Sequence, residues 1–314
     1  MAPHTPPRSA PAQPAPAQLT PAQRALAHPA PEHSAHQRAD TGRSEARRTR
    51  RGAPRFRMQP GGPEFRGGRW MGLVLLLVTL AMWQIATRFD HPDFVLSPSE
   101  IARHFVEALW SGELLPHIGA SLVRSLPGFV AGSLIGVVLG LLAGVARSLD
   151  QLLSPVVFLT YPVPKIVFLP IVMLWVGIGD LSKIAVIALA CFYPCFINAY
   201  YGARGTSALL VWSGLNMGAR RSQIFRKVVV PSALPLVFAG LRVSLALSFI
   251  LLFSTEMINA RSGLGFLIRQ SESSLRFDLM YVAIVAVAAL GYAGDQMLIL
   301  MRRRVLAWQD ATSG

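Results

Sequence analysis

Six long apolar runs, separated by polar segments, follow one another from residue 70 to residue 301. Each run is long enough to cross the ~30 Å hydrocarbon core of a bilayer as a helix, and none shows the alternating polarity of a membrane barrel strand. Backbone groups in lipid must bond within their own segment, so helices are expected. The sequence therefore predicts an all-α integral membrane protein with transmembrane helices at about 70–87, 120–145, 153–177, 184–201, 234–253 and 280–301.

The third run differs from the others because prolines interrupt it. Pro155, Pro162, Pro164 and Pro170 each lack the backbone donor that a helix interior uses. We therefore expect this span to be broken, whereas no comparable break is expected in the other five.

The second run carries a glycine at every fourth position: Gly132, Gly136, Gly140 and Gly144. Residues four apart lie on the same face of a helix, so the four glycines form a stripe. In membranes such small-residue faces let a neighbouring helix approach closely. The stripe therefore predicts a tightly packed bundle.

The basic residues between the runs indicate the orientation, since Lys and Arg gather on the cytoplasmic side of a membrane. An arginine-rich segment precedes the first run, and Arg147 follows the second. Five basic residues lie between the fourth and fifth runs, and three arginines follow the sixth. All four segments fall on one side if the chain crosses six times. We therefore expect both termini in the cytoplasm.

The segment between the fourth and fifth runs, about residues 203–231, is too long and too regular to be a bare connection. We call it the finger. Its apolar positions follow a helical period, and Gly218 interrupts that pattern where a sharp reversal is expected. Arg220 and Arg221 open a second amphipathic stretch, which Pro231 and a second proline four residues later are expected to end. The finger is either a hairpin on the membrane surface or a docking element for a cytoplasmic motor.

Ionisable residues inside the apolar runs are costly in a bilayer and suggest a function by default. Arg124 and Glu256 are expected at similar depth near the outer side, and Arg242 and Asp295 at similar depth nearer the cytoplasm. One interpretation is two structural ion pairs, with the Arg242–Asp295 pair buried near the cytoplasmic side, and the other places Arg124 on a path for anions. Asn198, on the fourth run, serves either a cavity or polar packing.

Composition separates a membrane domain from an N-terminal tail. The chain is 52% hydrophobic and 15% charged, with a mean hydropathy of +0.43 and a net charge of +14. Residues 1–69 hold 12 arginines, 12 of the 23 prolines and almost no aliphatic runs, so they bury too little to offset chain entropy. We expect a disordered cytoplasmic tail at 1–68, a first transmembrane helix at 69–90, a core with five transmembrane helices at 91–308, and a short tail at 309–314.

The tail has three interpretations. Its arginines could bind anionic lipid or nucleic acid. Alternatively, the tail is a genomic extension without function, or it results from a start codon placed upstream of Met58 or Met71. No folded motif accompanies the arginines, so we expect no nucleic-acid partner.

No motif in the sequence predicts catalysis. A P-loop, a Gly-x-Ser-x-Gly nucleophile elbow and a His-Glu-x-x-His zinc motif are all absent from the sequence. Cys191 and Cys195 lie one helical turn apart without a third ligand nearby, so we expect packing residues rather than a metal site or a disulfide. The chain is expected to have no catalytic residue, no metal and no cofactor of its own.

Four segments and the finger carry a family resemblance. The segments are FVLSPSEI (94–101), HIGASLVRSLPGF (117–129), YPVPKIVFLPIVMLWVGIGDLSK (161–183) and EMINARSGLGFLI (256–268). In the finger, Gly218 is followed after nine residues by Val228, Val230 and Pro231. This pattern is similar to the latter part of the EAA loop of permease subunits in bacterial ATP-binding-cassette importers. The whole resembles the nitrate, sulfonate and taurine branch of these binding-protein-dependent inner-membrane components.

The resemblance implies a type I importer permease fold in the bacterial inner membrane. It implies a homodimer with a pathway between the subunits for a small solute, either an anionic one such as a sulfonate, nitrate or taurine, or a small heterocyclic precursor. A periplasmic binding protein would deliver the solute, and a cytoplasmic ATP-binding subunit would hold the ATP and contact the finger. The coupling residues are expected to be Trp212, Ser213, Gly214, Gly218, Ala219, Arg220, Arg221 and Pro231.

One departure from the family affects the finger. The family's Glu-Ala-Ala is replaced here by Trp212, Ser213 and Gly214, so one family contact is missing. The main alternative is a secondary transporter or channel that works without ATP. It predicts inverted repeats with broken helices in matching halves, whereas only the third run is clearly broken. A membrane scaffold protein would explain the glycine stripe but not the basic finger.

Overall fold

The computed structural model describes residues 68–89 and 94–307. The chain divides into two units, Met1–Gly68 and Arg69–Gly314. The tail predicted to be disordered, residues 1–68, lies almost entirely outside the described residues, and so does the tail 309–314.

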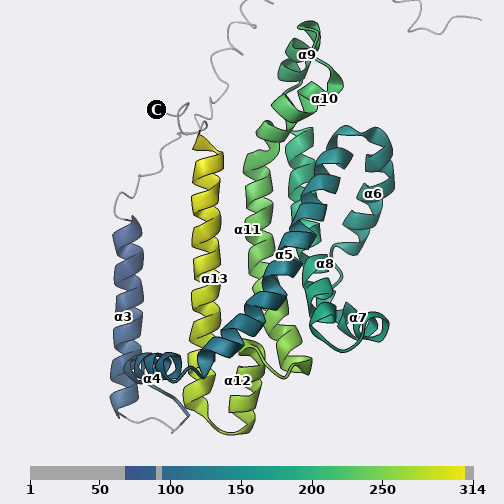
Figure 1. Cartoon of the computed structure of the whole chain (residues 1–314). Coiled ribbons are helices and arrows are strands. Elements are labelled where there is room, and N and C mark those ends of the chain that lie inside the picture. Colours follow the sequence, from purple (N-terminus) through teal and green to yellow (C-terminus); the bar gives the residue numbers. More distant parts are fainter. Residues whose placement is uncertain (1–67, 90–93, 308–314) are drawn as a thin grey trace, which may run out of the picture. The chain divides into compact units, whose positions relative to one another are not determined.

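The regular structure of the described residues is entirely helical, which confirms the predicted all-α membrane fold (Figure 1). Five helical segments are long and apolar enough to span a membrane, and a bent pair, Arg147–Thr160 with Lys165–Val176, gives a sixth where the pair is counted as one span. The helices are α3 (Gly68–Phe89), α4 (Pro98–Trp110), α5 (Leu114–Val145), α6 (Arg147–Thr160), η2 (Lys165–Phe168), α7 (Leu169–Val176), α8 (Asp180–Arg204), α9 (Ala208–Asn216), α10 (Arg221–Ile224), the π-helix η3 (Phe225–Val229), α11 (Val230–Asn259), α12 (Leu264–Ser273) and α13 (Phe277–Val305).

The third span is the bent pair, and its break is more local than the four prolines predict. Helix α6 and the segment formed by η2 and α7 meet at an angle of 98°. The break contains Pro162 and Pro164, whereas Pro155 lies inside α6 and Pro170 lies in the first turn of α7. A proline in a first turn loses no helical hydrogen bond, so Pro170 is compatible with a continuous helix.

Helix α5 packs on α8 through the predicted glycine stripe. A Cβ added at any of the four glycines would come closer than 3.0 Å to atoms of α8. These atoms include the backbone carbonyl oxygens of Ala188, Phe192 and Phe196. Gly128 extends the stripe by another turn, where a Cβ would lie 2.8 Å from the side chain of Ile187. The stripe therefore brings two helix backbones into direct contact.

Helix α8 is also packed against α11. The Sγ atom of Cys191 lies 3.4 Å from the carbonyl oxygen of Ser244, and that of Cys195 lies 3.1 Å from the Ser244 hydroxyl. Both thiols are buried and free, as the packing interpretation predicts. Asn198 donates to a carbonyl of its own helix at 2.8 Å and contacts Gly240 of α11. These contacts favour the packing interpretation of Asn198.

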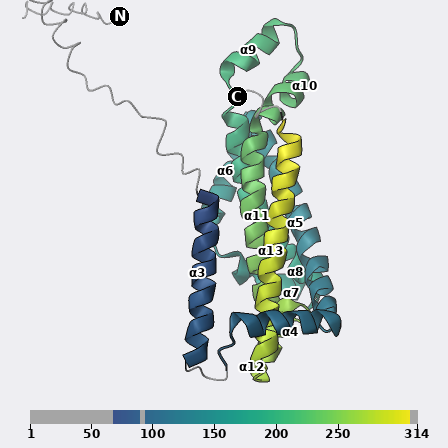
Figure 2. The ribbon, with the colours of Figure 1, turned by 90° about the vertical axis from the view of Figure 1, so that its left-hand side faces the viewer.

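Short helices lie at the two ends of the spanning helices (Figure 1, Figure 2). Helices α9 and α10 of the finger lie at one end, and α4 and α12 lie at the other, with α4 directed across the spanning helices. Helix α4 begins with a capping box, in which the side chains of Ser97 and Glu100 each bond the backbone of the other. Helices α5, α8 and α13 run toward the finger, and α11 runs away from it.

Candidate functional site

The finger is a helical hairpin. Helix α9 ends at Asn216, and α10 begins at Arg221. Between them Gly218 has a φ of +79°, a left-handed conformation that is costly for a residue with a Cβ. The helix–Gly218–helix arrangement predicted from the sequence is therefore present.

A small apolar cluster holds the two arms of the finger together. Ile224 of α10 is buried, and its side chain lies 3.5 Å from where a Cβ on Gly214 of α9 would stand. Val211 and Ala219 pack on the same cluster, which continues through Val229 to residues of α5 and α8. The finger is thus fastened to the helical bundle by burial of apolar side chains.

The outer surface of the finger is apolar and exposed, with basic residues beside it. The side chain of Trp212 is 63% exposed and that of Met217 is 87% exposed. Ser213, Arg220 and Arg221 are also exposed. Contiguous exposed apolar residues rimmed by polar ones mark a surface that contacts another protein or the membrane.

The second arm does not end at its prolines, contrary to the sequence prediction. Helix α10 continues through the π-helix η3 into α11, which gives one helical segment of 39 residues, Arg221–Asn259. Pro231 lies in the first turn of α11, and Pro235 lies inside it. A π-helix shifts the backbone hydrogen bonds by one residue. The helix can therefore continue from η3 into α11 although Pro231 lacks a backbone donor. Pro231 therefore belongs to the spanning helix rather than to a boundary.

At the end of α11 away from the finger, Arg124 and Glu256 form a buried ion pair. Their Nη1 and Oε1 atoms are 2.7 Å apart, and their side chains are 6% and 0% exposed. Arg124 also donates from Nε to Asp180 at 2.7 Å, and from its two Nη groups to the carbonyl and hydroxyl oxygens of Ser262 at 2.5 and 3.0 Å. The pairing expected from depth is present. Burial of Arg124 argues against the alternative of an open anion path at this residue.

Donors from α5 and α12 surround the Glu256 carboxylate. The hydroxyl of Ser121 lies 3.0 and 2.9 Å from its two oxygens, and the N–H of Gly265 donates to it at 3.0 Å. Gly263 has a φ of +114°, and a Cβ there would collide with the carboxylate. Both oxygens are bonded, as a charge removed from water requires. These partners were not predicted from the sequence.

Arg242 and Asp295 pair as predicted, but they are not buried. Arg242 Nε lies 2.6 Å from Asp295 Oδ1, and Nη2 lies 2.8 Å from Oδ2, so the contact is bidentate. The side chains are 63% and 25% exposed. The expectation of burial is wrong for the single subunit, because depth along a helix does not determine which face of the bundle a residue occupies.

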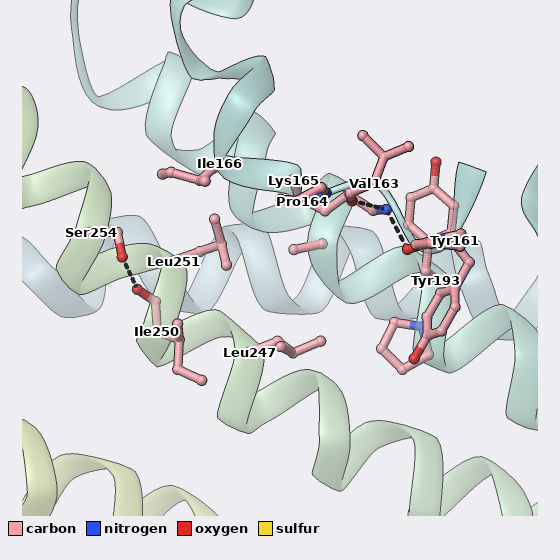
Figure 3. A pocket seen from close by; sticks show the side chains of 13 residues that line it. Tyr161, Val163, Pro164, Lys165, Ile166, Tyr193, Leu247, Ile250, Leu251 and Ser254 are labelled. Carbon is pink, nitrogen blue, oxygen red and sulfur yellow. Dashed lines mark hydrogen bonds between the residues drawn. The ribbon is translucent and has the colours of Figure 1, made fainter.

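A pocket of about 450 Å³ opens beside the bend of the third span (Figure 3). Tyr161, Tyr193 and residues of α11 line it. The Nζ atom of Lys165 donates to the carbonyls of Thr160, Tyr161 and Val163 at 2.8, 2.9 and 2.7 Å. The same atom lies 3.9 Å from the centre of the Tyr193 ring. Lys165 therefore bonds the last carbonyl of α6 and two carbonyls of the break that follows it, and it places a positive charge in the pocket wall.

The structure does not bring the predicted residues into one site. The finger lies at one end of the segment Arg221–Asn259 and the Arg124–Glu256 pair at the other. Within the described residues, no group of three or more His, Cys, Asp or Glu side chains is placed to hold a metal ion. The arrangement is that of a membrane bundle with an exposed helical finger at one end.

Comparison with known proteins identifies the family. Residues 132–306 match the family described as binding-protein-dependent transport system inner membrane component. A permease protein assigned to aliphatic sulfonates transport in Bacillus subtilis is 31% identical over 78% of this chain and 90% of its own length. The taurine transport system permease protein of Escherichia coli is 29% identical over 76% of this chain and 88% of its own length. The riboflavin transport system permease protein of Chloroflexus aurantiacus is 33% identical over 75% of this chain and 89% of its own length. With its spanning helices and its finger, the chain belongs to this family of inner-membrane permease components of binding-protein-dependent transport.

Proposed function

We propose that two copies of this chain span the bacterial inner membrane and enclose the path of a small anionic solute. The family implies a substrate-binding protein and an ATP-binding subunit as partners. In this proposal ATP is bound and hydrolysed on that partner, and the chain has no ATPase site of its own. The finger side faces the cytoplasm, together with both termini, because the basic residues gather there.

The finger is the observation that supports coupling to an ATPase. It presents an exposed apolar surface on a hairpin that is packed onto the spanning helices. Trp212 stands where the family has a glutamate, and we assign it the role of an apolar anchor in a partner pocket. Arg220 and Arg221 favour encounter with an acidic surface.

Crosslinking tests this contact. Asn216→Cys and Arg220→Cys should each crosslink to the ATP-binding subunit in the assembled importer. Leu275→Cys, on a residue 73% exposed between α12 and α13, is the control and should not. Absence of both crosslinks in an active complex would show that the finger is not the coupling element. Uptake that persists without the ATP-binding subunit would favour the alternative of an ATP-independent transporter or channel.

The pocket beside the third span supports an anionic solute. Its wall carries the Lys165 charge between two tyrosine rings, and two of the relatives named above are assigned to taurine and aliphatic sulfonates. We propose that a sulfonate passes along this wall, attracted by a positive charge in a partly desolvated site.

Uptake of labelled solutes tests the proposed solute class. Cells that express the importer should accumulate labelled taurine or an alkanesulfonate, and Lys165→Gln should weaken that uptake, whereas Lys165→Arg should retain most of it. Riboflavin is the uncharged comparison. Uptake of riboflavin without uptake of sulfonates would disprove the proposed solute class and leave the coupling proposal intact.

A further inference from the structure

Two pockets adjoin each other where the finger meets the spanning helices. The first, of about 480 Å³, lies between the finger and the ends of α5 and α8, and we call it the finger pocket. The second, of about 550 Å³, lies between α5, α6 and α8, and we call it the arginine pocket. Both are lined by Val145 and Arg204, whose side chains are about half exposed. A single ligand can therefore lie across both pockets.

The finger pocket is apolar in its depth and polar at its edge. Its apolar wall is the inner face of the finger, made by Val211, Leu215, Ile224, Phe225 and Val229. Arg204 and Thr206 also line it, and the Oγ1 atom of Thr206 is buried without a hydrogen-bond partner within the described residues. Buried hydroxyls are rarely left unpaired. The pocket therefore suits an apolar chain that carries oxygen atoms at one end.

The arginine pocket carries more positive than negative charge. Arg147, Arg204 and Asp150 are its ionised side chains. The Asp150 carboxylate already accepts bonds from Ser154, Tyr200 and Arg204 at 2.6, 2.9 and 3.0 Å. Within the part of the chain that the structure describes, the side chain of Arg147 makes no hydrogen bond or ion pair. Arg147 is thus free to bind an anion, and guanidinium groups bind phosphate oxygens strongly.

The two pockets lie at the level of a membrane surface. Val145 is the last residue of α5, Arg147 is the first of α6 and Arg204 is the last of α8. All three are ends of helical segments that are long and apolar enough to span a membrane, so they are expected near the lipid headgroups. Basic pockets between spanning helices on the cytoplasmic side are suited to anionic headgroups. A phosphate headgroup with an attached acyl chain matches both pockets.

Other occupants fit the two pockets less well. The N-terminal segment of this chain, residues 1–69, contains 12 arginines and would be repelled by Arg147 and Arg204. An acidic segment of the ATP-binding subunit would match the arginine pocket, but its polar residues would leave the apolar wall of the finger pocket without a partner. The exposed Trp212 and Met217 that we assign to contact with that subunit do not line either pocket.

We propose that the arginine pocket and the finger pocket together bind one anionic phospholipid of the cytoplasmic leaflet. Its phosphate lies at Arg147 and Arg204, and one of its acyl chains lies against the inner face of the finger. The lipid then bridges the finger and the ends of α5 and α8. This inference rests on the proposed cytoplasmic position of the finger.

Retention of lipid by the purified importer tests the headgroup site. The assembled importer is placed in phosphatidylcholine nanodiscs that contain phosphatidylglycerol and is then extracted in detergent. We expect it to retain phosphatidylglycerol, measured by mass spectrometry, and Arg147→Gln to retain about 5-fold less. Arg147→Lys should retain most of it. Arg303→Gln, which removes an exposed charge from the last turn of α13, is the matched control and should retain as much as the unchanged chain.

Two results would overturn the headgroup site. Equal retention by the Arg147→Gln and Arg303→Gln variants would show that Arg147 does not hold the lipid. Displacement of the lipid by inorganic phosphate alone would show a site for free anions instead. A crosslink from Arg147→Cys to the ATP-binding subunit in the assembled importer would assign the arginine pocket to that protein and would also overturn the proposal.

Photolabelling tests the position of the acyl chain. A phosphatidylglycerol with a photoreactive group in its acyl chain should label finger peptides that contain Val211, Leu215 or Phe225, and the matching phosphatidylcholine should label them several-fold less. Label confined to other helices would overturn the acyl site. The orientation is tested separately with Asn216→Cys in intact cells. Its reaction with an impermeant thiol reagent from outside would refute the cytoplasmic position, whereas nanodiscs expose both faces and report lipid retention in either orientation.

Discussion

Glu256 shows what a carboxylate needs near the end of a spanning helix. It is 0% exposed and accepts bonds from Ser121, Arg124 and the backbone N–H of Gly265. These donors belong to α5 and α12, whereas Glu256 belongs to α11. One buried carboxylate therefore connects three helices, and its removal is expected to weaken the packing of all three.

Removing the positive partner should destabilise this connection strongly. Arg124→Gln leaves Glu256 buried without its counter-charge, which costs about 3–5 kcal/mol. We expect a lower melting temperature for the purified complex and partial recovery in the double variant Arg124→Gln/Glu256→Gln. Arg103→Gln, in an exposed pair with Glu107 on α4, is the control and should change little. Equal melting temperatures for the Arg124 and Arg103 variants would contradict this view of the pair.

Gly218 should be sensitive to substitution because of its backbone alone. Nothing lies within 4 Å of a Cβ at this position, yet its φ is +79°. Gly218→Val should add strain of about 1–2 kcal/mol or more and redirect the finger. We expect an inserted permease that copurifies with little ATP-binding subunit and shows little substrate-stimulated hydrolysis. Gly218→Asn, a residue that tolerates this conformation, should keep both. Normal coupling of the Gly218→Val variant to the ATP-binding subunit would mean that the change of chain direction at Gly218 is not needed for coupling.

For single residues, the sequence predicted which charged side chains pair, but it did not predict how far each pair is buried. Depth along the helices was enough to pair Arg124 with Glu256 and Arg242 with Asp295. It could not show that one pair is sealed by Ser121 and the other open, because that depends on which helices lie opposite each face. Such neighbours come from tertiary packing and leave no periodic signal in the chain.

Helices α5 and α8 are held at a separation that only glycine permits. The stripe on α5 contacts backbone carbonyl oxygens of α8 without intervening side chains. In lipid, close packing of this kind replaces the hydrophobic driving force that joins helices in water. The pair therefore forms a rigid centre on which α11 also packs.

Filling the stripe should prevent assembly. A side chain at Gly136 would meet the carbonyl of Phe192 and the Cβ of Cys195, the latter at 2.9 Å, so Gly136→Leu must push α8 away. We expect loss of intact complex on size-exclusion chromatography. Gly72→Leu, on α3 with nothing within 4 Å of its added Cβ, is the matched control and should assemble normally. A Gly136→Leu complex with unchanged melting behaviour would place the stripe outside the packed interface.

The positions of helices were predicted correctly where hydropathy alone determines them. The spanning helices were located by their apolar runs, and the break in the third was expected from its prolines. The 98° angle of this bend was not predicted, because it depends on how η2 and α7 pack against α8. Helices α4 and α12 were also missed, since short amphipathic helices outside the membrane resemble loops in composition. The π-helix before Pro231 had no signal, because a shifted backbone pairing has no side-chain pattern.

At the scale of the whole chain, composition distinguishes the residues before α3 from the apolar remainder, and we expect only the remainder to be needed for transport. The residues before α3 are rich in arginine and proline and carry no predicted motif. We expect that removing residues 2–60 leaves membrane insertion and uptake unchanged at matched expression. A longer deletion, through residue 80, also removes much of α3 and should impair insertion or assembly. Loss of uptake with the shorter deletion, at a normal amount of protein, would assign the tail a function.

The segment Arg221–Asn259 has a further consequence for the transport cycle. It is one helical rod of 39 residues, with the finger at one end and Glu256 near the other. A helix of that length measures about 58 Å, so a tilt of about 10° around its middle would move its two ends by roughly 5 Å in opposite directions. If the rod pivots about its middle, a displacement of the finger is therefore accompanied by an opposite displacement of Glu256, and we expect the far end of the bundle to respond to a load on the finger.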